Sequence, residues 1–253
     1  MKKEPLIQFK EVEKRLGKQN VLRGVNLEIF QSERLSIIGR SGCGKSVLLK
    51  HLVGLMKPDR GEILIDEKNI VNFNEVELVP IRKKIGIVFQ GGALFDSLTV
   101  EANIAFPLKE EKKYSVEEIK TRVAEVLEAV GLPNQQRKMP SELSGGMKKR
   151  VSLARAIVRL PEIILYDEPT TGLDPITADS INQLINQISE RYGITSVIVT
   201  HDMKSVFAIS DRIAMLKDGK IYYTGTAENF QKNSDESIQH FIHGIADINE
   251  VLI

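Results

Sequence analysis

The sequence has a single cysteine, almost no net charge and no long hydrophobic run, and each of these features excludes a class of protein. One cysteine excludes an internal disulfide and suits a reducing compartment, so we expect a cytoplasmic protein. The 35 Lys and Arg residues against 34 Asp and Glu give a net charge of +1, which argues against nucleic acid as the main partner, because nucleic-acid-binding domains are usually basic. No apolar run approaches the roughly 20 residues that a membrane-spanning helix needs.

The chain also lacks internal repeats and any linker rich in Pro, Gly or Ser. At its start, Glu4 and Pro5 follow two lysines at once, so we expect no signal peptide. The 253 residues are 42% hydrophobic and 27% charged, which is ordinary for a globular protein. This length allows one large domain or two tightly joined lobes.

Short β-branched runs alternate with helical periodicities, a pattern typical of an α/β protein with a largely parallel sheet. We expect strands at residues 35–38, 62–66, 85–89, 163–166, 195–200 and 212–216. Helices are expected at residues 47–56, 116–130 and 177–192. Asp218-Gly219 predicts a hairpin after the last strand, because both residues tolerate positive φ. Residues 91–160 change in character and indicate a helical lobe inserted into the sheet domain.

The most specific signal is a phosphate-loop pattern, G-x-x-x-x-G-K-[ST], between an expected strand and an expected helix. It consists of Gly39, Arg40, Ser41, Gly42, Cys43, Gly44, Lys45 and Ser46. The glycines let the backbone approach phosphate oxygens, and the N–H groups point inward at the positive end of the next helix. Lys45 is expected at the β- and γ-phosphates of a nucleotide, and Ser46 at Mg²⁺. For Cys43 we favour a small filler residue over a redox switch.

Two carboxylates end the apolar strand expected at residues 163–166. The carboxyl end of a buried parallel strand opens onto the ligand crevice, so Asp167 would orient Mg²⁺, directly or through a water. Glu168 would face the γ-phosphate and either act as general base toward a water there or polarise it. Asp-Glu after a strand is often only a solvated turn, but the phosphate loop favours the site. His201 follows the strand at 195–200 and is expected at the γ-phosphate. Gln90 follows another strand, and its amide would touch both Mg²⁺ and the water.

A second glycine-rich segment, Leu143-Ser144-Gly145-Gly146-Met147, precedes a helix and can hold an anion on its backbone. The basic run at residues 148–150 can be taken as a nucleic-acid patch, but we favour the solvated face of that helix. Asp202 is expected as a helix N-cap.

These motifs resemble those of the ATP-binding cassette (ABC) ATPase family over most of the chain. Their order along the chain carries the resemblance: the phosphate loop, Gln90, the segment 143–147, Asp167-Glu168, Gly172-Leu173-Asp174 and His201. The resemblance implies a RecA-like P-loop ATPase core with an N-terminal antiparallel β subdomain and an inserted α-helical subdomain. Residues 1–90 and 161–225 would form the core with its β subdomain, and residues 91–160 the helical subdomain. Residues 226–253 would be a C-terminal tail that braces a dimer or contacts an accessory subunit.

The same resemblance implies a head-to-tail homodimer with ATP between the two copies. Ser144, Gly145 and Gly146 would contact the ATP held by the partner's phosphate loop, and Leu173 and Asp174 would link the two sites. Two departures from the family's pattern stand out. Leu16 occupies the place of the usual adenine-stacking aromatic residue, and Met147 replaces the usual Gln of the signature segment.

Within the family, several short segments resemble Mla/Mce-type phospholipid transport ATPases. They are Gly92-Ala93-Leu94-Phe95, Met139-Pro140-Ser141-Glu142, Asp174-Pro175-Ile176-Thr177 and Gly244-Ile245-Ala246-Asp247. This resemblance implies a membrane permease and an Mce-domain lipid-binding protein as partners, phospholipid as cargo, and a peripheral location at the cytoplasmic face of the inner membrane. The permease would dock near the apolar stretch at residues 94–106.

Other functions remain to be weighed against this one. An ABC importer or exporter ATPase for another cargo would share every motif of the site. A soluble cassette ATPase acting on nucleic acid or ribosomes usually needs a coiled-coil insertion or tandem cassettes, which 253 residues do not accommodate. A regulatory module without turnover would not need Glu168 and His201. A guanine-nucleotide switch would need an Asn-Lys-x-Asp segment, which the chain lacks.

Overall fold

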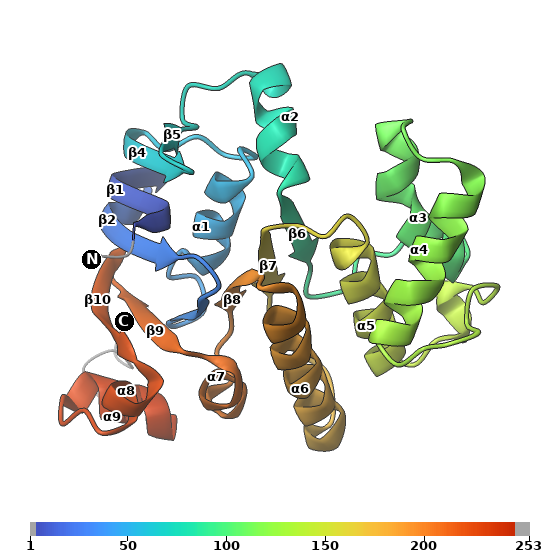
Figure 1. Cartoon of the computed structure of the whole chain (residues 1–253). Coiled ribbons are helices and arrows are strands. Elements are labelled where there is room, and N and C mark those ends of the chain that lie inside the picture. Colours follow the sequence, from blue (N-terminus) through green and yellow to red (C-terminus); the bar gives the residue numbers. More distant parts are fainter. Residues whose placement is uncertain (1–3, 246–253) are drawn as a thin grey trace.

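The computed structural model describes residues 4–245, which form two sheets, their flanking helices and a projecting helical lobe (Figure 1). The larger sheet has the strand order β10-β9-β3-β8-β7-β6. Neighbouring strands are parallel, except for β10, which runs antiparallel to β9 through the expected hairpin at Asp218-Gly219. The strands are β3 (Arg34–Ile38), β6 (Ile85–Val88), β7 (Ile163–Asp167), β8 (Thr195–Val199), β9 (Arg212–Lys217) and β10 (Lys220–Thr226).

The smaller sheet is antiparallel, with the order β2-β1-β4-β5. It contains β1 (Pro5–Leu16), β2 (Gln19–Phe30), β4 (Arg60–Ile65) and β5 (Lys68–Asn69). One apolar core joins it to the larger sheet through α1 (Lys45–Leu52), whose Leu48 and Leu52 are fully buried between them. The RecA-like α/β core with an N-terminal antiparallel sheet is therefore confirmed.

The helix after the phosphate loop is shorter than expected. It was expected to run from residue 47 to residue 56, but α1 ends at Leu52. Gly54 has a left-handed φ of 66°, which ends the helical path, and Leu55 is 65% exposed rather than part of the apolar face. The prediction was wrong at this end because the left-handed turn at Gly54 ends the helix before it reaches Pro58, the residue expected to stop it.

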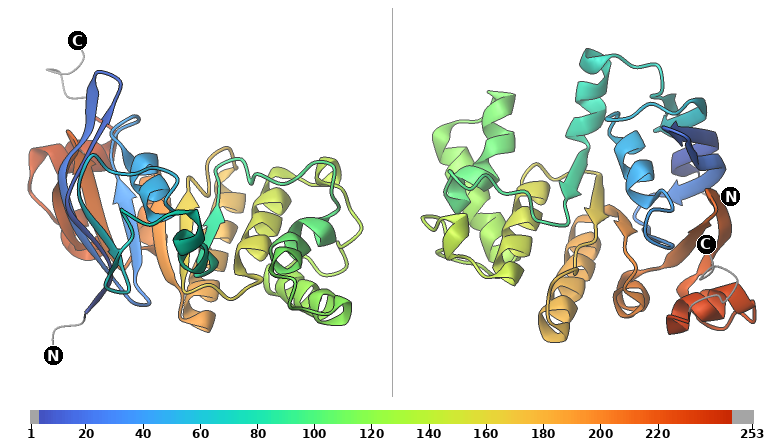
Figure 2. Two further views of the ribbon diagram at one scale, coloured as in Figure 1. Left: turned by 90° about the horizontal axis from the view of Figure 1, so that it is seen from above. Right: turned by 180° about the vertical axis from the view of Figure 1, so that it is seen from behind.

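The helical lobe contains α3 (Val100–Glu111), α4 (Val116–Ala129), the 3₁₀ turn η1 (Pro140–Glu142) and α5 (Gly145–Ile157). Figure 2 shows the lobe standing to one side of the two sheets. Its core includes Ile104, Leu127 and Val151 and continues into the sheet through Val88 and Ile164. Helix α5 therefore belongs to both parts, since it packs against the lobe helices and against β6.

The remaining helices frame the parallel sheet and the end of the chain. They are α2 (Glu75–Lys83), α6 (Pro175–Tyr192), α7 (Met203–Ile209), α8 (Ala227–Gln231) and α9 (Glu236–His243). Phe230 and Ile238 bury α8 and α9 against β9. Ala246, Asp247 and the rest of the expected tail to residue 253 lie outside the described residues. In residues 4–245 no helix is long and apolar enough to cross a bilayer.

Candidate functional site

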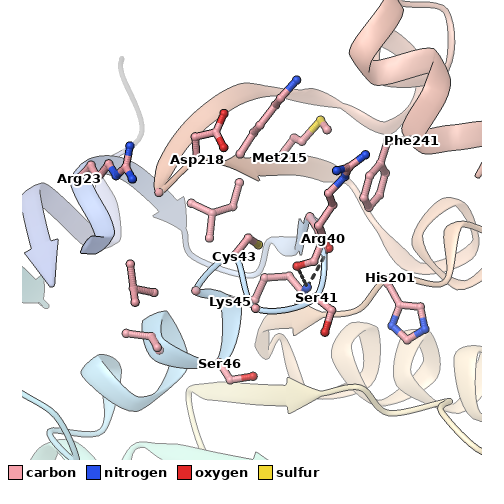
Figure 3. Close-up of a pocket in the computed structure, with 18 of the residues that line it drawn as sticks. Arg23, Arg40, Ser41, Cys43, Lys45, Ser46, His201, Met215, Asp218 and Phe241 are labelled. Atoms are coloured by element: carbon pink, nitrogen blue, oxygen red, sulfur yellow. Dashed lines mark hydrogen bonds between the residues drawn. The ribbon is translucent and has the colours of Figure 1, made fainter. Parts of the chain in front are cut away.

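A cavity of about 1160 Å³ lies at the carboxyl ends of β3, β7 and β8 (Figure 3). It is lined by most of the residues that the sequence singled out: Leu16, the whole phosphate loop from Gly39 to Ser46, Gln90, Asp167, Glu168 and His201. The ends of four parallel strands, β6 before Gln90 being the fourth, thus bring together segments that lie far apart in the sequence. Four expected site residues, Ser144, Gly145, Gly146 and Asp174, do not line it.

The phosphate loop joins β3 to α1, and its shape requires glycine. Gly39 and Gly44 have φ of 154° and 110°, and a Cβ on Gly39 would lie 2.4 Å from the Leu216 carbonyl oxygen. A Cβ on Gly44 would lie 2.9 Å from the Val21 side chain. Gly44 is also the N-cap of α1, where no side chain caps the helix. The first N–H groups of α1 are thus left for a ligand, and this is the usual arrangement of an anion site.

Lys45 is held inside the loop and is only 7% exposed. Its Nζ donates to the carbonyl oxygens of Gly39 at 2.8 Å and Arg40 at 2.9 Å, as the dashed lines in Figure 3 show. Both acceptors are neutral, so they satisfy the ammonium hydrogens without cancelling its charge. A buried cation of this kind favours an anion beside it.

The Ser46 hydroxyl lies beside the end of β7. Its Oγ donates to Oδ1 of Asp167 at 3.2 Å. Asp167 is half-buried, and this burial raises the pKa of its carboxyl group, an effect that the Ser46 hydrogen bond opposes. Within residues 4–245 no three His, Cys, Asp or Glu side chains converge to form a metal cage. A hydroxyl and one carboxylate instead fit Mg²⁺, which commonly takes one or two protein oxygens together with substrate phosphates.

Glu168 and His201 form a hydrogen-bonded pair at the open end of the cavity. His201 Nδ1 donates to Glu168 Oε1 at 2.9 Å, and Thr171 Oγ1 donates to the other carboxylate oxygen at 3.0 Å. The Glu168 side chain is 13% exposed, whereas that of His201 is 63% exposed. Glu168 also has a left-handed φ of 51°. Such a conformation in a non-glycine residue costs roughly 1–3 kcal/mol and is common where function requires it.

The second glycine-rich segment lies outside the cavity, at the start of α5. Ser144 is the N-cap of α5, with its Oγ accepting from the Met147 N–H, and both Ser144 and Gly145 are exposed. Asp174 caps α6 in the same way through the N–H groups of Ile176 and Thr177. The hydrogen bonds from Thr177 hold the pKa of the Asp174 carboxyl below its usual range. A Cβ on Gly146 would lie 2.6 Å from Thr177, so these two exposed segments are neighbours.

The basic run at residues 148–150 is not the solvated face that the sequence suggested. Lys149 is 6% exposed, and its ammonium donates to the carbonyl oxygens of Gln90 and Glu168. Arg150 donates to the Val130 carbonyl and to Ser180 Oγ. The prediction was wrong because Gly146, Lys149, Leu153 and Ile157 recur at helical spacing on the buried face of α5. That spacing is the signal in the sequence that could have revealed Lys149.

The wall of the cavity also contains three apolar or weakly polar side chains, those of Leu16, Cys43 and Phe241. Leu16 is 41% exposed and offers an apolar surface where an aromatic residue was expected. Cys43 packs against the apolar core, and burial raises the pKa of its thiol, which fits a filler residue. Two weak helical patterns follow Gly225 in the sequence, but they gave no sign that α9 lines the cavity with residues such as Phe241. Asp202 is the N-cap of α7, as expected.

Comparisons with known proteins agree with this geometry. A family model described as ABC transporter matches residues 22–171. The intermembrane phospholipid transport system ATP-binding protein MlaF of Escherichia coli (strain K12) is 39% identical over 242 residues, covering 96% of this chain and 90% of that protein. The methionine import ATP-binding protein MetN of Carboxydothermus hydrogenoformans is 46% identical over 211 residues, covering 83% of this chain but 62% of that protein.

A solved structure also resembles this fold closely. It is the dimeric, post-hydrolysis state of the ATP-binding cassette MJ0796 bound to ADP and Pi. It superposes with a TM-score of 0.80 at 38% identity, covering 87% of this chain and 98% of that one.

Proposed function

This chain belongs to the ABC transporter family, and on that premise we propose that it is the ATPase subunit of a Mla/Mce-type phospholipid transporter, acting through a separate permease. The hydrolytic part of the proposal depends on one observation above all, the hydrogen-bonded pair of Glu168 and His201 beside a complete phosphate loop. The lipid part is supported by similarity to MlaF along 96% of the chain.

In this proposal the phosphate loop binds ATP mainly through its backbone. The N–H groups of residues 39–46 surround the phosphates, and the Lys45 ammonium exchanges its two carbonyl partners for β- and γ-phosphate oxygens. Leu16 supplies an apolar contact for the base. Ser46, Gln90 and Asp167 would hold Mg²⁺ with their oxygen atoms, Asp167 directly or through a water. When bound, Mg²⁺ neutralises charge that develops on the phosphates.

Glu168 acts as the general base. Its carboxylate accepts a proton from the water that attacks the γ-phosphorus, so that the bond to the β-γ bridging oxygen breaks and ADP and phosphate leave. His201 fixes the carboxylate through Nδ1 and turns its other ring nitrogen toward the γ-phosphate region. The Gln90 amide orients the water and contacts the metal. These groups reach the reaction from three strand ends, so catalysis here is mostly positioning and electrostatics.

The segments Ser144–Gly146 and Leu173-Asp174, in which Ser144, Gly145 and Asp174 are exposed, then act across a dimer. In this dimer a second copy of the chain packs head to tail against the first. Its Ser144 hydroxyl and the backbone of Gly145 and Gly146 contact the ATP bound in the first copy's cavity. This arrangement accounts for a helix N-terminus capped only by Ser144, away from the cavity of its own chain. The resemblance to a dimeric cassette bound to ADP and Pi supports it.

The permease contact is expected at a second, apolar groove of about 400 Å³ between the sheet and the lobe. Its rim includes Phe89, Phe95 and Phe106, which are 39–45% exposed, and the rings of Phe95 and Phe106 lie 4.9 Å apart. An exposed aromatic cluster of this kind favours a protein partner. We place the chain at the cytoplasmic face of the inner membrane, attached through that permease, with an Mce-domain protein in the same assembly.

A second cargo class has support from one observation. The chain is 46% identical to a methionine import ATPase, although it spans only 62% of that protein. The experiment that distinguishes phospholipid from amino-acid cargo is purification of the tagged chain from detergent-solubilised membranes. Mass spectrometry then identifies the proteins and lipids recovered with it. A permease recovered with an Mce-domain protein and phospholipid supports lipid transport. A permease with an amino-acid-binding protein and no lipid would overturn the cargo and keep the ATPase. Recovery of no membrane protein would contradict the transporter assignment altogether.

A further inference from the structure

Lys149 is a buried cation that the proposed mechanism does not use. It lies on α5, one helical turn after the glycines of Ser144–Gly146, and is 6% exposed. Among residues 4–245, its ammonium donates to two groups, both of them main-chain oxygens: that of Gln90, after β6, and that of Glu168, after β7, at 3.2 Å. One side chain of the lobe thus joins the two loops that carry the expected water-orienting amide and the expected base.

Burial lowers the pKa of Lys149, because the lobe-to-sheet junction removes water from the ammonium. An apolar residue would fill this junction at a smaller desolvation penalty. The nearby carboxylates of Glu168 and Asp167 favour the charged ammonium electrostatically, but the groups that it hydrogen-bonds are backbone carbonyls. A hydrogen bond to a backbone carbonyl fixes the position of the main chain, whereas a hydrogen bond to a carboxylate would fix only another side chain.

The backbone of Glu168 is the part of the site that most needs such support. It has a left-handed φ in a non-glycine residue, and its N–H donates to the Val199 carbonyl at 2.8 Å. The Lys149 bond fixes the carbonyl on the other side of the same residue. Glu168 is therefore held at both main-chain groups while its carboxylate points at His201.

A second cation on α5, Arg155, donates hydrogen bonds to the loop after β6. Arg155 donates to the Gly92 carbonyl at 2.9 Å and to the Ala93 carbonyl at 2.7 Å. Lys149 and Arg155 together tie residues 90–93 to α5 through three main-chain oxygens. The position of the loop after β6 therefore depends on α5 and not on the side chains of the loop itself.

We propose that Lys149 is a positioning residue that locks the main chain of Gln90 and Glu168 onto α5, so that the base, the water-orienting amide and the Ser144–Gly146 segment move as one unit. The catalytic half of this statement rests on the proposed ATPase function. The mechanical half, that Lys149 holds two loops in place, does not.

The test compares Lys149→Met with Lys149→Arg and with Lys120→Met, a control on the exposed face of α4 whose side chain is 60% exposed. We measure kcat and KM for ATP hydrolysis, and amide hydrogen exchange in residues 89–93 and 167–171. Lys149→Met should lower kcat about 10- to 100-fold, because misplacement by about 1 Å can have effects of that size. Its KM should stay within about twofold, since the phosphate loop is untouched. Exchange should quicken in both segments, and Lys149→Arg should restore most of kcat and the slow exchange.

Two results would overturn the proposal: kcat and exchange in Lys149→Met equal to those of Lys120→Met, or a raised KM with unchanged kcat. If Lys149→Met does not fold by its thermal unfolding curve, Lys149→Gln is used, because its amide is too short to bridge both carbonyls. If the wild-type chain hydrolyses no ATP, the proposed function fails, and the exchange comparison still decides whether Lys149 holds the loops.

Discussion

The two halves of the cavity are built in opposite ways. The phosphate-loop half is one continuous stretch of eight residues, and its working groups are main-chain N–H groups shaped by glycines. The other half collects Gln90, Asp167, Glu168 and His201 from separate strand ends and depends on α5 to hold its loops. The first half is a local structure, whereas the second is a product of packing. Substitutions in the first half should therefore weaken nucleotide binding, and substitutions in the second half should lower the turnover rate.

The largest expected effect is on turnover alone. Glu168→Gln keeps the size and the Thr171 neighbour but removes the base, so kcat should fall about 10²- to 10⁴-fold. Nucleotide affinity should stay unchanged, because the phosphate loop is intact. Phosphate release and equilibrium binding of a fluorescent ATP analogue measure the two quantities, with Glu125→Gln on the exposed surface of α4 as control. Unchanged turnover would remove Glu168 from the reaction.

The next effect is on binding alone. Lys45→Met removes the ammonium that the loop holds for the phosphates, and charged hydrogen bonds contribute roughly 1.5–3 kcal/mol each. Nucleotide affinity should therefore fall about 10- to 100-fold. The thermal midpoint without nucleotide should not fall, since an apolar side chain replaces a buried charge. Lys57→Met, at an exposed position, should alter neither quantity. A stability loss as large as the affinity loss would mean that Lys45 mainly supports the fold.

A smaller effect tests how closely α5 must approach the sheet. A Cβ on Gly86 in β6 would lie 2.7 Å from the Ala156 carbonyl oxygen in α5. Gly86→Ala should lower the free energy of unfolding by about 1–3 kcal/mol through overpacking. Gly91→Ala is the matched control, since nothing lies within 4 Å of a Cβ there. Urea unfolding measures both variants. Equal stabilities would show that the junction adapts, and would weaken the argument that α5 fixes the second half of the site.

The smallest effect concerns Cys43, the cysteine within the phosphate loop. Burial raises the pKa of its thiol, so the neutral form dominates at pH 7 and less thiolate is present than in a free cysteine. Alkylation by iodoacetamide should be several-fold slower than for free cysteine, should accelerate only at a higher pH than free cysteine does, and should be blocked by ATP. Peroxide should leave nucleotide binding intact. Rapid alkylation at pH 7, or loss of binding that Cys43→Ala prevents, would support the redox switch instead.

The same contrast explains what the sequence could predict. Residues 39–46, the buried strands and the Asp218-Gly219 hairpin were predictable, because each depends on neighbours in the chain. The end of α1 at Leu52 and the lining by α9 were not, because contacts with distant segments decide both. Lys149 lies between these cases. Its helical spacing with Leu153 and Ile157 was visible, but its charge suggested solvent.

The left-handed backbone of Glu168 has a consequence for how this chain can change under selection. Glycine adopts that conformation without strain, so Glu168→Gly would relieve part of the local penalty while removing the carboxylate. Stability and the proposed role as base therefore favour different residues at this position. Selection for abundance alone would favour glycine there, so a glutamate that persists under such selection would support the proposed role of its carboxylate.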